Sequence, residues 1–256
     1  VMHNLAIALQ KKGYDVTGSD DEIFEPSRTR LEQYGLMPEE RGWHPGKIDR
    51  SIDTAILGMH ARADNPELLR AQELGIKITS FPEYLYNQTK EKKRIVIAGR
   101  HGKTTITAMI MHVLKYNGIK FDYMAGSALK GFETMVGLSD DSEIAVFEGD
   151  EYLTSAIDPR PKFVHYKPDI AVLNGISWDH MNIYKTEEAY KDSFRALISA
   201  INPSGLLLYF KDDPVVEAIV SEIRSDIQKI PYNVHGYFVN RLGVFGATHD
   251  RMVPLK

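Results

Sequence analysis

Short apolar runs alternate with stretches of helical periodicity along the first 90 residues of the chain. Leu5, Ala8 and Leu9 fall on one side of a predicted helix at the start of the chain, and Gly13 is placed to end it. The other predicted elements of this part are strands at residues 15–20, 53–58 and 76–80 and helices at residues 27–34 and 65–74. Strands that alternate with helices indicate an α/β fold built on a parallel sheet.

A second block of the same type follows the charged residues 90–93, which can be either a linker or the solvated start of a strand. Residues 94–98 are predicted to form a buried strand. An amphipathic helix then runs to residues 117–118, with Ile106, Met109, Ile110, Val113 and Leu114 at helical spacing. Further strands are predicted at residues 144–147, 170–173 and 206–210. We therefore predict two domains, residues 1–90 and residues 91–256.

Composition narrows the classes of protein that these elements can build. The chain has 256 residues, a net charge of −4 and no Cys, so disulfides, Cys-bound metal centres and a Cys nucleophile are excluded. Mild acidity argues against binding to nucleic acid by bulk charge. The longest apolar runs, such as residues 205–210, are too short to span a membrane, and no signal peptide is visible. We expect a cytoplasmic protein.

The sharpest motif follows the strand at residues 94–98 and precedes the amphipathic helix. It reads Gly99-Arg100-His101-Gly102-Lys103-Thr104-Thr105. Glycines allow backbone N–H groups to turn towards an anion, and a helix N-terminus attracts negative charge. The motif therefore predicts a phosphate loop, in which Lys103 reaches the β- and γ-phosphates and the Thr104 hydroxyl binds Mg²⁺. The general phosphate-loop template also requires glycine at position 97, where this chain has Ile. Gly-Lys-Thr alone can arise by chance, but the flanking strand and helix argue against chance.

Acidic and imidazole side chains follow two of the later strands. Glu148 begins an acidic segment after residues 144–147, and His180 lies shortly after residues 170–173. Carboxyl ends of neighbouring parallel strands meet at one edge of a sheet, so both side chains are predicted to face the Lys103 site. Glu148 and Thr104 suit Mg²⁺, whereas His180 can instead hold a substrate carboxylate or a water. A solvated acidic turn is the alternative for residues 148–151.

Two weaker candidates have structural explanations of comparable weight. Asp212-Asp213-Pro214 follows the strand at residues 206–210, where an Asp-Pro pair more often begins a helix as its cap than binds a metal. His60 follows the strand at residues 53–58 and can contact a ligand there, but an exposed loop histidine fits the sequence equally well.

Three segments together resemble the Mur ligase family. The loop at residues 99–105 resembles that family's ATP loop, which also lacks the first glycine of the general template. Glu148-Gly149-Asp150-Glu151-Tyr152 resembles its Glu-Ala-Asp-Glu-Tyr segment. Residues 174–181, Asn174-Gly175-Ile176-Ser177-Trp178-Asp179-His180-Met181, resemble its Asn-x-x-x-x-Asp-His segment. The resemblance implies a Rossmann-like N-terminal domain followed by a P-loop ATPase domain with a mostly parallel sheet.

The resemblance also implies an activity. Residues 162–168, which follow the acidic segment, most resemble one branch of the family. Members of that branch join a murein tripeptide, L-Ala-γ-D-Glu-meso-diaminopimelate, to UDP-N-acetylmuramate through an acyl phosphate. It implies ATP on residues 99–105, Mg²⁺ on Thr104, Glu148 and His180, and the muramoyl group near Asn174. Asp20 and His60 would lie in the uridine-diphosphate region. The branch that adds single L-alanine is the alternative. A nucleotide-binding module without ligase activity and a P-loop kinase are alternatives of other classes.

The chain departs from the family pattern at several places. Arg100 stands where the family commonly has Thr or Ser. Arg195 stands at the apparent position of a lysine that several members carbamylate. The resemblance further leads us to expect a strand and its turn before Val1, and a third domain after Lys256. The fragment 1–256 alone is therefore expected to be inactive.

Overall fold

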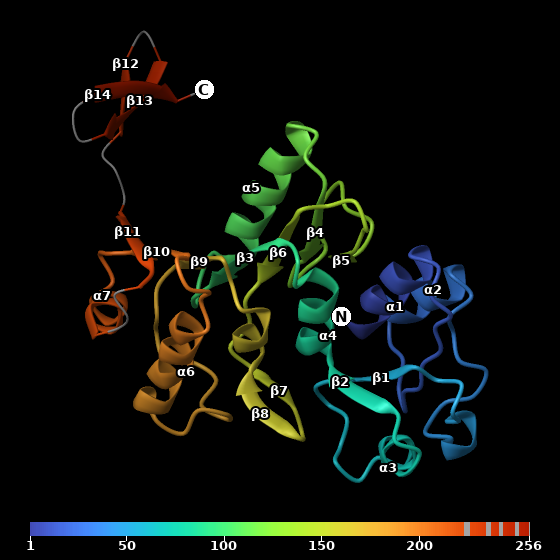
Figure 1. The fold of residues 1–256 in the computed structure, drawn as a ribbon. Coiled ribbons are helices and arrows are strands. Elements are labelled where there is room, and N and C mark those ends of the chain that lie inside the picture. The colour runs from blue at the N-terminus through green and yellow to red at the C-terminus, as the bar shows by residue number, and fades with distance from the viewer. Residues whose placement is uncertain (223–225, 234–236, 241–242, 249–250, 256) are drawn as a thin grey trace.

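A seven-stranded sheet forms the middle of the molecule (Figure 1). Its strands, in chain order, are β3 (Lys93–Ala98), β4 (Phe121–Met124), β5 (Val136–Gly137), β6 (Ile144–Glu148), β9 (Ile170–Leu173), β10 (Leu206–Phe210) and β11 (Gln228–Tyr232). The structure is a computed structural model that describes residues 1–222, 226–233, 237–240, 243–248 and 251–255. The strands predicted at residues 94–98, 144–147, 170–173 and 206–210 are confirmed.

The order of strands across the sheet determines which loops come together. That order is β11-β10-β9-β3-β6-β4-β5, with every neighbouring pair parallel except β4 and β5. β3 therefore lies between β6 and β9, and Ala98 pairs with Leu173 while Ile97 pairs with Glu148. The loops that leave these three carboxyl ends are neighbours. An open α/β sheet binds its ligands at such a point, where the direction of strand order changes.

Side chains that alternate along β3 face two separate hydrophobic cores, as the two-residue period of a strand requires. Ile97 packs on the side of α5 (Lys103–Tyr116), together with Met111. Val96 and Ala98 pack on the opposite side of the sheet. That side is covered by α4 (Phe81–Thr89), α6 (Glu187–Ser199) and α7 (Pro214–Glu222). Both faces of the central strand are therefore buried.

Helix α5 confirms the predicted helix but differs in the face that it buries. Thr107 and Met111 are fully buried against the sheet. Met109 and Val113, which the helical spacing places on the predicted apolar face, are 63% and 57% exposed. The helix has apolar residues around most of its circumference, so periodicity alone does not identify the side that meets the sheet.

The N-terminal part contains a smaller parallel sheet of two strands, β1 (Thr54–Leu57) and β2 (Lys77–Ser80), as predicted. Its helices are α1 (Met2–Lys11), α2 (Ser27–Gln33), the short 3-10 helix η1 (Pro45–Lys47) and α3 (Pro66–Glu73). The strand predicted at residues 15–20 is wrong, because this segment has no assigned secondary structure and no ladder partners in the described chain. A strand requires a neighbour for its backbone hydrogen bonds, and local sequence does not reveal whether one is present.

Helix α1 joins the N-terminal part to the large sheet. Leu5 and Leu9 pack in the same core as α4 and β3. Asn4 is fully buried; its side-chain oxygen accepts hydrogen bonds from Arg30, at 3.0 Å, and from the Met135 N–H, at 3.1 Å. These contacts connect α1 to α2 and to the segment before β5. The division of the chain at residue 90 stays a prediction.

The remaining elements lie after β6. The antiparallel pair β7 (Leu153–Ser155) and β8 (Asp158–Pro161) leads into the 3-10 helix η2 (Lys162–Tyr166). A three-stranded antiparallel sheet follows β11 and consists of β12 (Tyr237–Asn240), β13 (Gly243–Thr248) and β14 (Arg251–Leu255). None of the helices within the described residues has the length and apolar character that crossing a membrane requires.

The N-cap of α3 gives a first test of the fold. The Asn65 side-chain oxygen accepts hydrogen bonds from the N–H groups of Glu67 and Leu68, at 2.9 and 3.1 Å. We expect Asn65→Ala to lower the free energy of unfolding by about 1 kcal/mol, measured by chemical denaturation. Asn65→Asp keeps an oxygen acceptor and is the matched control. Equal stability of the alanine variant and the wild type would contradict this role.

Candidate functional site

The connection from β3 to α5 has the backbone geometry of a phosphate loop. Gly99 and Gly102 have φ values of +117° and +73°, a region that side chains with a Cβ rarely adopt. A Cβ on Gly99 would also lie 2.8 Å from the backbone nitrogen of Asn174. The loop ends at the N-terminus of a 14-residue helix, whose first N–H groups have no partner within the helix. Both glycines are therefore required by the path of the chain.

Lys103 bends back over the loop that precedes it. Its ammonium nitrogen donates to the carbonyl oxygen of Gly99 at 2.7 Å and lies 3.3 Å from a carboxylate oxygen of Glu151. The side chain keeps 18% of its surface exposed. Its positive charge is thus held at the mouth of the loop, where an incoming phosphate can contact it.

Thr104 and Glu148 come together at the next position, as the sequence predicts. The Thr104 hydroxyl donates to Glu148 Oε1 at 2.8 Å, and the N–H of Gly126 donates to Glu148 Oε2 at 2.8 Å. Neighbouring oxygens around Mg²⁺, with metal–oxygen distances of about 2.1 Å, lie roughly 3 Å apart. The hydroxyl and carboxylate therefore fit two ligand positions of this ion.

His180 contacts the carboxylate of Glu151. Its Nε2 lies 3.1 Å from Glu151 Oε1, and its ring lies 4.2 Å, between centroids, from that of Tyr152. The His180 backbone has a φ of +55°. The hydrogen bond from its N–H lowers the pKa of Asp179, and the charges of His180 and Arg100 lower it further. Among the described residues, no group of three or more His, Asp and Glu is arranged to hold a metal ion.

Glu151 is the residue that sequence reasoning did not single out. It is 1% exposed, and the Tyr190 hydroxyl donates to its Oε1 at 3.1 Å. Burial raises the pKa of Tyr190, and the Glu151 charge raises it further, so this hydroxyl stays a donor. The Tyr184 hydroxyl donates to the Glu151 carbonyl oxygen. Its sequence signals were membership of the acidic segment after β6 and of the segment that resembles the family pattern, and neither of them predicted its contacts.

Arg100 points away from the phosphate loop. Its guanidinium donates to the Ser177 hydroxyl at 2.8 Å and to the Trp178 carbonyl oxygen at 3.3 Å. It also lies 3.7 Å from an Asp179 carboxylate oxygen. A long cation at this position is therefore accommodated without crowding the loop, because it binds the segment that leads to His180.

Asn174 links the loop after β9 to the phosphate loop. Its amide nitrogen donates to the His101 carbonyl oxygen at 2.7 Å, and its amide oxygen accepts from the Tyr232 hydroxyl at 2.7 Å. The N–H of Arg100 donates to the Gly175 carbonyl oxygen at 3.1 Å. The predicted residues from three separate segments thus form one connected group.

Other predicted residues lie outside this group. His60 and Asp20 are exposed in loops of the N-terminal part. Asp213 accepts hydrogen bonds from the N–H groups of Val215 and Val216, which confirms the structural reading of this acidic pair as a cap. Its other oxygen accepts from the Ile176 N–H at 2.9 Å.

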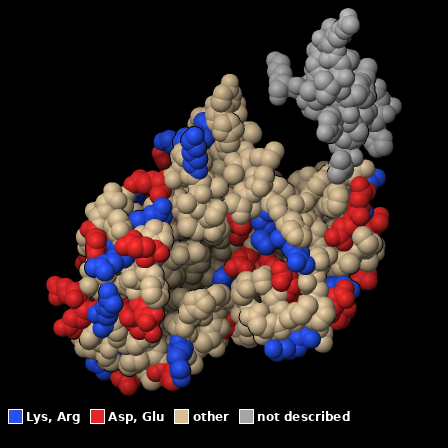
Figure 2. All heavy atoms as spheres, turned by 180° about the vertical axis from the view of Figure 1, so that it is seen from behind, with Lys and Arg blue, Asp and Glu red and all other residues tan. Residues whose placement is uncertain are grey.

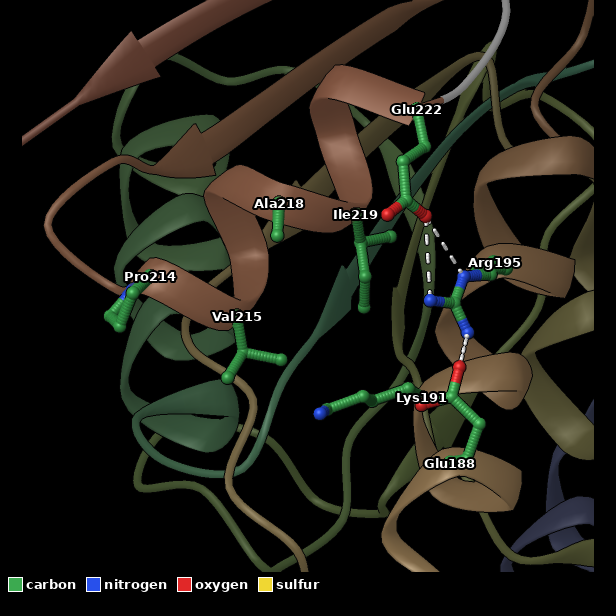
Figure 3. Close-up of a pocket in the computed structure, with 8 residues that line it drawn as sticks. All are labelled: Glu188, Lys191, Arg195, Pro214, Val215, Ala218, Ile219 and Glu222. Carbon is green, nitrogen blue, oxygen red and sulfur yellow. Dashed lines mark hydrogen bonds and ion pairs between the residues drawn. The ribbon is translucent and has the colours of Figure 1, made fainter.

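Arg195 lies in a pocket of about 270 Å³ between α6 and α7 (Figure 3). There its guanidinium contacts Glu188, Asp192 and Glu222. The pocket is lined by neither the phosphate loop nor Glu148. Arg195 therefore takes no part in the group around Lys103.

Basic and acidic side chains are interspersed over the face of the molecule that Figure 2 shows, and a hollow lies near its middle. The basic residues on this face are not gathered into one extended surface. The distribution on this face agrees with the net charge of −4.

A glycine-bearing loop between a parallel strand and a helix, with an acidic residue at the end of the neighbouring strand, defines a P-loop α/β domain. Comparison with known families identifies the family within this class. Residues 97–240 match the Mur ligase middle domain. The chain belongs to the Mur ligase family.

Two individual proteins of this family are similar to the chain over most of its length. The chain is 34% identical over 210 residues to a UDP-N-acetylmuramate–L-alanyl-γ-D-glutamyl-meso-2,6-diaminoheptandioate ligase of Haemophilus influenzae, covering 81% of this chain and 46% of the relative. It is 28% identical over 222 residues to a UDP-N-acetylmuramate–L-alanine ligase of Syntrophomonas wolfei, covering 87% of this chain and 46% of the relative. The chain thus spans about half the length of these relatives.

The fold has a close counterpart among solved structures. The crystal structure of a UDP-N-acetylmuramate:L-alanyl-γ-D-glutamyl-meso-diaminopimelate ligase from Neisseria meningitides superimposes with a TM-score of 0.83 at 25% identity. The match covers 98% of this chain and 82% of that chain. The α/β fold expected from the sequence is confirmed by this likeness and by the mostly parallel sheet.

Proposed function

We propose that the whole protein is an ATP-dependent amide ligase. It joins the carboxylate of UDP-N-acetylmuramate to the amine of the murein tripeptide L-Ala-γ-D-Glu-meso-diaminopimelate, through an acyl phosphate. The observation that carries the proposal is the convergence of Lys103, the Thr104–Glu148 pair and His180 at the carboxyl ends of β3, β6 and β9. Similarity to a relative named for these substrates supports the choice of substrates.

The phosphate loop supplies the nucleotide site of this ligase. Residues 99–105 surround the ATP phosphates, with Lys103 on the β- and γ-phosphates. Thr104 and Glu148 hold Mg²⁺, whose charge, when it is bound, neutralises charge that develops on the transferred phosphoryl group. In this structure the Lys103 ammonium group donates to the Gly99 carbonyl oxygen. With ATP bound, it donates to phosphate oxygens instead.

The part of the proposed site that carries out acyl transfer includes His180 and Asn174. His180 sits beside the acyl phosphate or a second Mg²⁺, and Asn174 lies near the muramoyl group. Residues 1–90 form the domain for the uridine diphosphate part, to which Asp20 and His60 contribute, and residues 91–256 belong to the ATP-binding domain. Because its substrates are ATP and a UDP-sugar, we propose that the enzyme acts in the cytoplasm.

Substrate dependence and chemical trapping test this function in the full-length protein. ADP release should require UDP-N-acetylmuramate and ATP, and hydroxylamine should trap the activated carboxylate as a hydroxamate. The tripeptide should support faster turnover than L-alanine. Equal or faster turnover with L-alanine would instead assign the protein to the L-alanine-adding branch.

The same assay separates the ligase from functions of other classes. Nucleotide binding without ADP release under any substrate combination would indicate a binding module. Transfer of phosphate to a stable hydroxyl ester, with no hydroxamate formed, would indicate a kinase.

Gly126, whose N–H donates to the Glu148 carboxylate, provides a test of the proposed metal site. A Cβ on Gly126 would lie 2.5 Å from Glu148 Oε1, so Gly126→Ala must displace the carboxylate from Thr104. We expect the fold to persist, because the displaced atoms end a flexible side chain, and turnover to fall by about tenfold to a hundredfold. The Mg²⁺ concentration for half-maximal activity should rise. Gly46→Ala, at an open position, is the control; unchanged Mg²⁺ dependence in Gly126→Ala would contradict the site.

A further inference from the structure

We propose that Glu151 is a positioning residue that fixes the phosphate-loop lysine and His180 relative to each other. The proposal rests on the proposed ligase function and concerns a residue that contacts neither nucleotide nor metal in that scheme. Its two carboxylate oxygens have different partners, one at the start of α5 and one in the loop after β9. Oε2 lies 3.3 Å from Lys103 Nζ, and Oε1 lies 3.1 Å from His180 Nε2.

The position of the Glu151 carboxylate is itself held from behind. The hydroxyl of Tyr190, a fully buried residue of α6, donates to Oε1. The buried Tyr184 hydroxyl donates to the Glu151 main-chain carbonyl oxygen. These two contacts anchor both the side chain and the backbone of Glu151 to the protein interior. The carboxylate is therefore a fixed reference point between β3 and the loop after β9.

Charge as well as hydrogen bonding accounts for the choice of glutamate here. The carboxylate is 2% exposed, and a buried anion is stable only when cations or hydrogen-bond donors surround it. Lys103 and His180 are only partly exposed, at 18% and 23% of their side-chain surfaces. A neutral amide at position 151 would keep the volume but remove the negative charge that attracts the Lys103 ammonium group. Both side chains would then occupy a wider range of positions.

This arrangement has a kinetic consequence. In the proposed ligase, Lys103 contacts the phosphate that is transferred, and His180 sits beside the acyl phosphate or a second Mg²⁺. Glu151 sets the separation of these two groups, and small errors in position reduce the rate of a step more than the affinity for one substrate. Loss of the carboxylate should therefore lower kcat much more than it weakens nucleotide binding.

A double-mutant cycle in the full-length enzyme tests the proposal. We expect Glu151→Gln to lower kcat by about tenfold to a hundredfold while the Kd for a non-hydrolysable ATP analogue changes by less than about threefold. The loss of kcat in His180→Ala combined with Glu151→Gln should be smaller than the product of the two single losses, because part of the effect of Glu151 acts through His180. Glu222→Gln, which alters a carboxylate in the α6–α7 pocket, is the matched control and should retain wild-type kcat.

The outcomes of these measurements test the positioning role of Glu151 and the ligase function separately. Multiplicative losses in the double variant, or a loss of analogue binding equal to the loss of kcat, would overturn the positioning role. If Glu151→Gln does not fold, judged by thermal melting, Tyr190→Phe replaces it; this variant keeps the carboxylate but removes one anchor, and should show a smaller kcat loss with unchanged analogue affinity. Unaltered kcat in the variant that folds would overturn the proposal. A wild-type protein without substrate-dependent ADP release would instead refute the ligase function itself.

Discussion

Replacing Lys103 by alanine in the full-length protein should abolish ligase turnover, with a loss of at least about a hundredfold to a thousandfold in kcat/KM. The ammonium group lies at the mouth of the phosphate loop and no other lysine or arginine of residues 99–105 points there, since Arg100 binds residues 177–179. Removing it takes away the main positive charge for the β- and γ-phosphates. Affinity for ATP, measured by calorimetry, should fall as well.

A surface lysine provides the comparison for this variant. Lys120 is 68% exposed and pairs with Asp141, so Lys120→Ala should retain turnover and nucleotide affinity. Thermal melting of both variants separates a local effect from unfolding. ATP binding by Lys103→Ala with wild-type affinity would show that the loop does not use this lysine, and would remove the basis for placing the nucleotide there.

Glu148→Gln should separate a ligase from a protein that only binds nucleotide. We expect kcat to fall by about a hundredfold or more, because the neutral amide is a poor ligand for Mg²⁺ and the metal charge is needed during phosphoryl transfer. Nucleotide affinity measured without Mg²⁺ should change little, since Glu148 contacts Thr104 and Gly126 and lies apart from Lys103 in the hydrogen-bond network. Steady-state kinetics over a range of Mg²⁺ concentrations gives the answer.

An exposed glutamate serves as the reference here. Glu133, 61% exposed and paired with Lys11, can be changed to Gln with the same loss of one charge. Glu133→Gln should keep both kcat and the Mg²⁺ dependence of the wild type. A Glu148→Gln enzyme with normal turnover and normal response to Mg²⁺ would exclude Glu148 as a ligand of the metal.

The sequence was sufficient to predict a feature where the residues that form it are contiguous. A helix was predicted to begin at residue 65, and in the structure the Asn65 side chain accepts hydrogen bonds from the first N–H groups of α3. The phosphate loop was recognisable because strand, glycines, lysine and helix are contiguous. Glu148 was predicted from its place directly after a buried strand, and its contact with Thr104 agrees with that prediction.

Other features depend on partners that are distant in the sequence. Residues 15–20 have the composition of a strand but no ladder in the described chain, so the prediction failed on a missing neighbour. Met109 and Val113 lie on an apolar side of α5 that does not face the sheet. Glu148 and Glu151 are both glutamates of one acidic segment and lie three residues apart. In the structure, Glu148 contacts Thr104, whereas Glu151 contacts Lys103 and His180.

The sequence by itself determined the α/β class, most of the strands, and the phosphate loop with its lysine and threonine, because periodicity and contiguous motifs encode them. Only the tertiary structure decided that β6 and β9 flank β3, that Arg100 turns away from the loop, and that Glu151 stands between Lys103 and His180. The physical reason is that strand order and buried ion pairs arise from contacts across the fold, and these contacts leave no periodic trace along the chain.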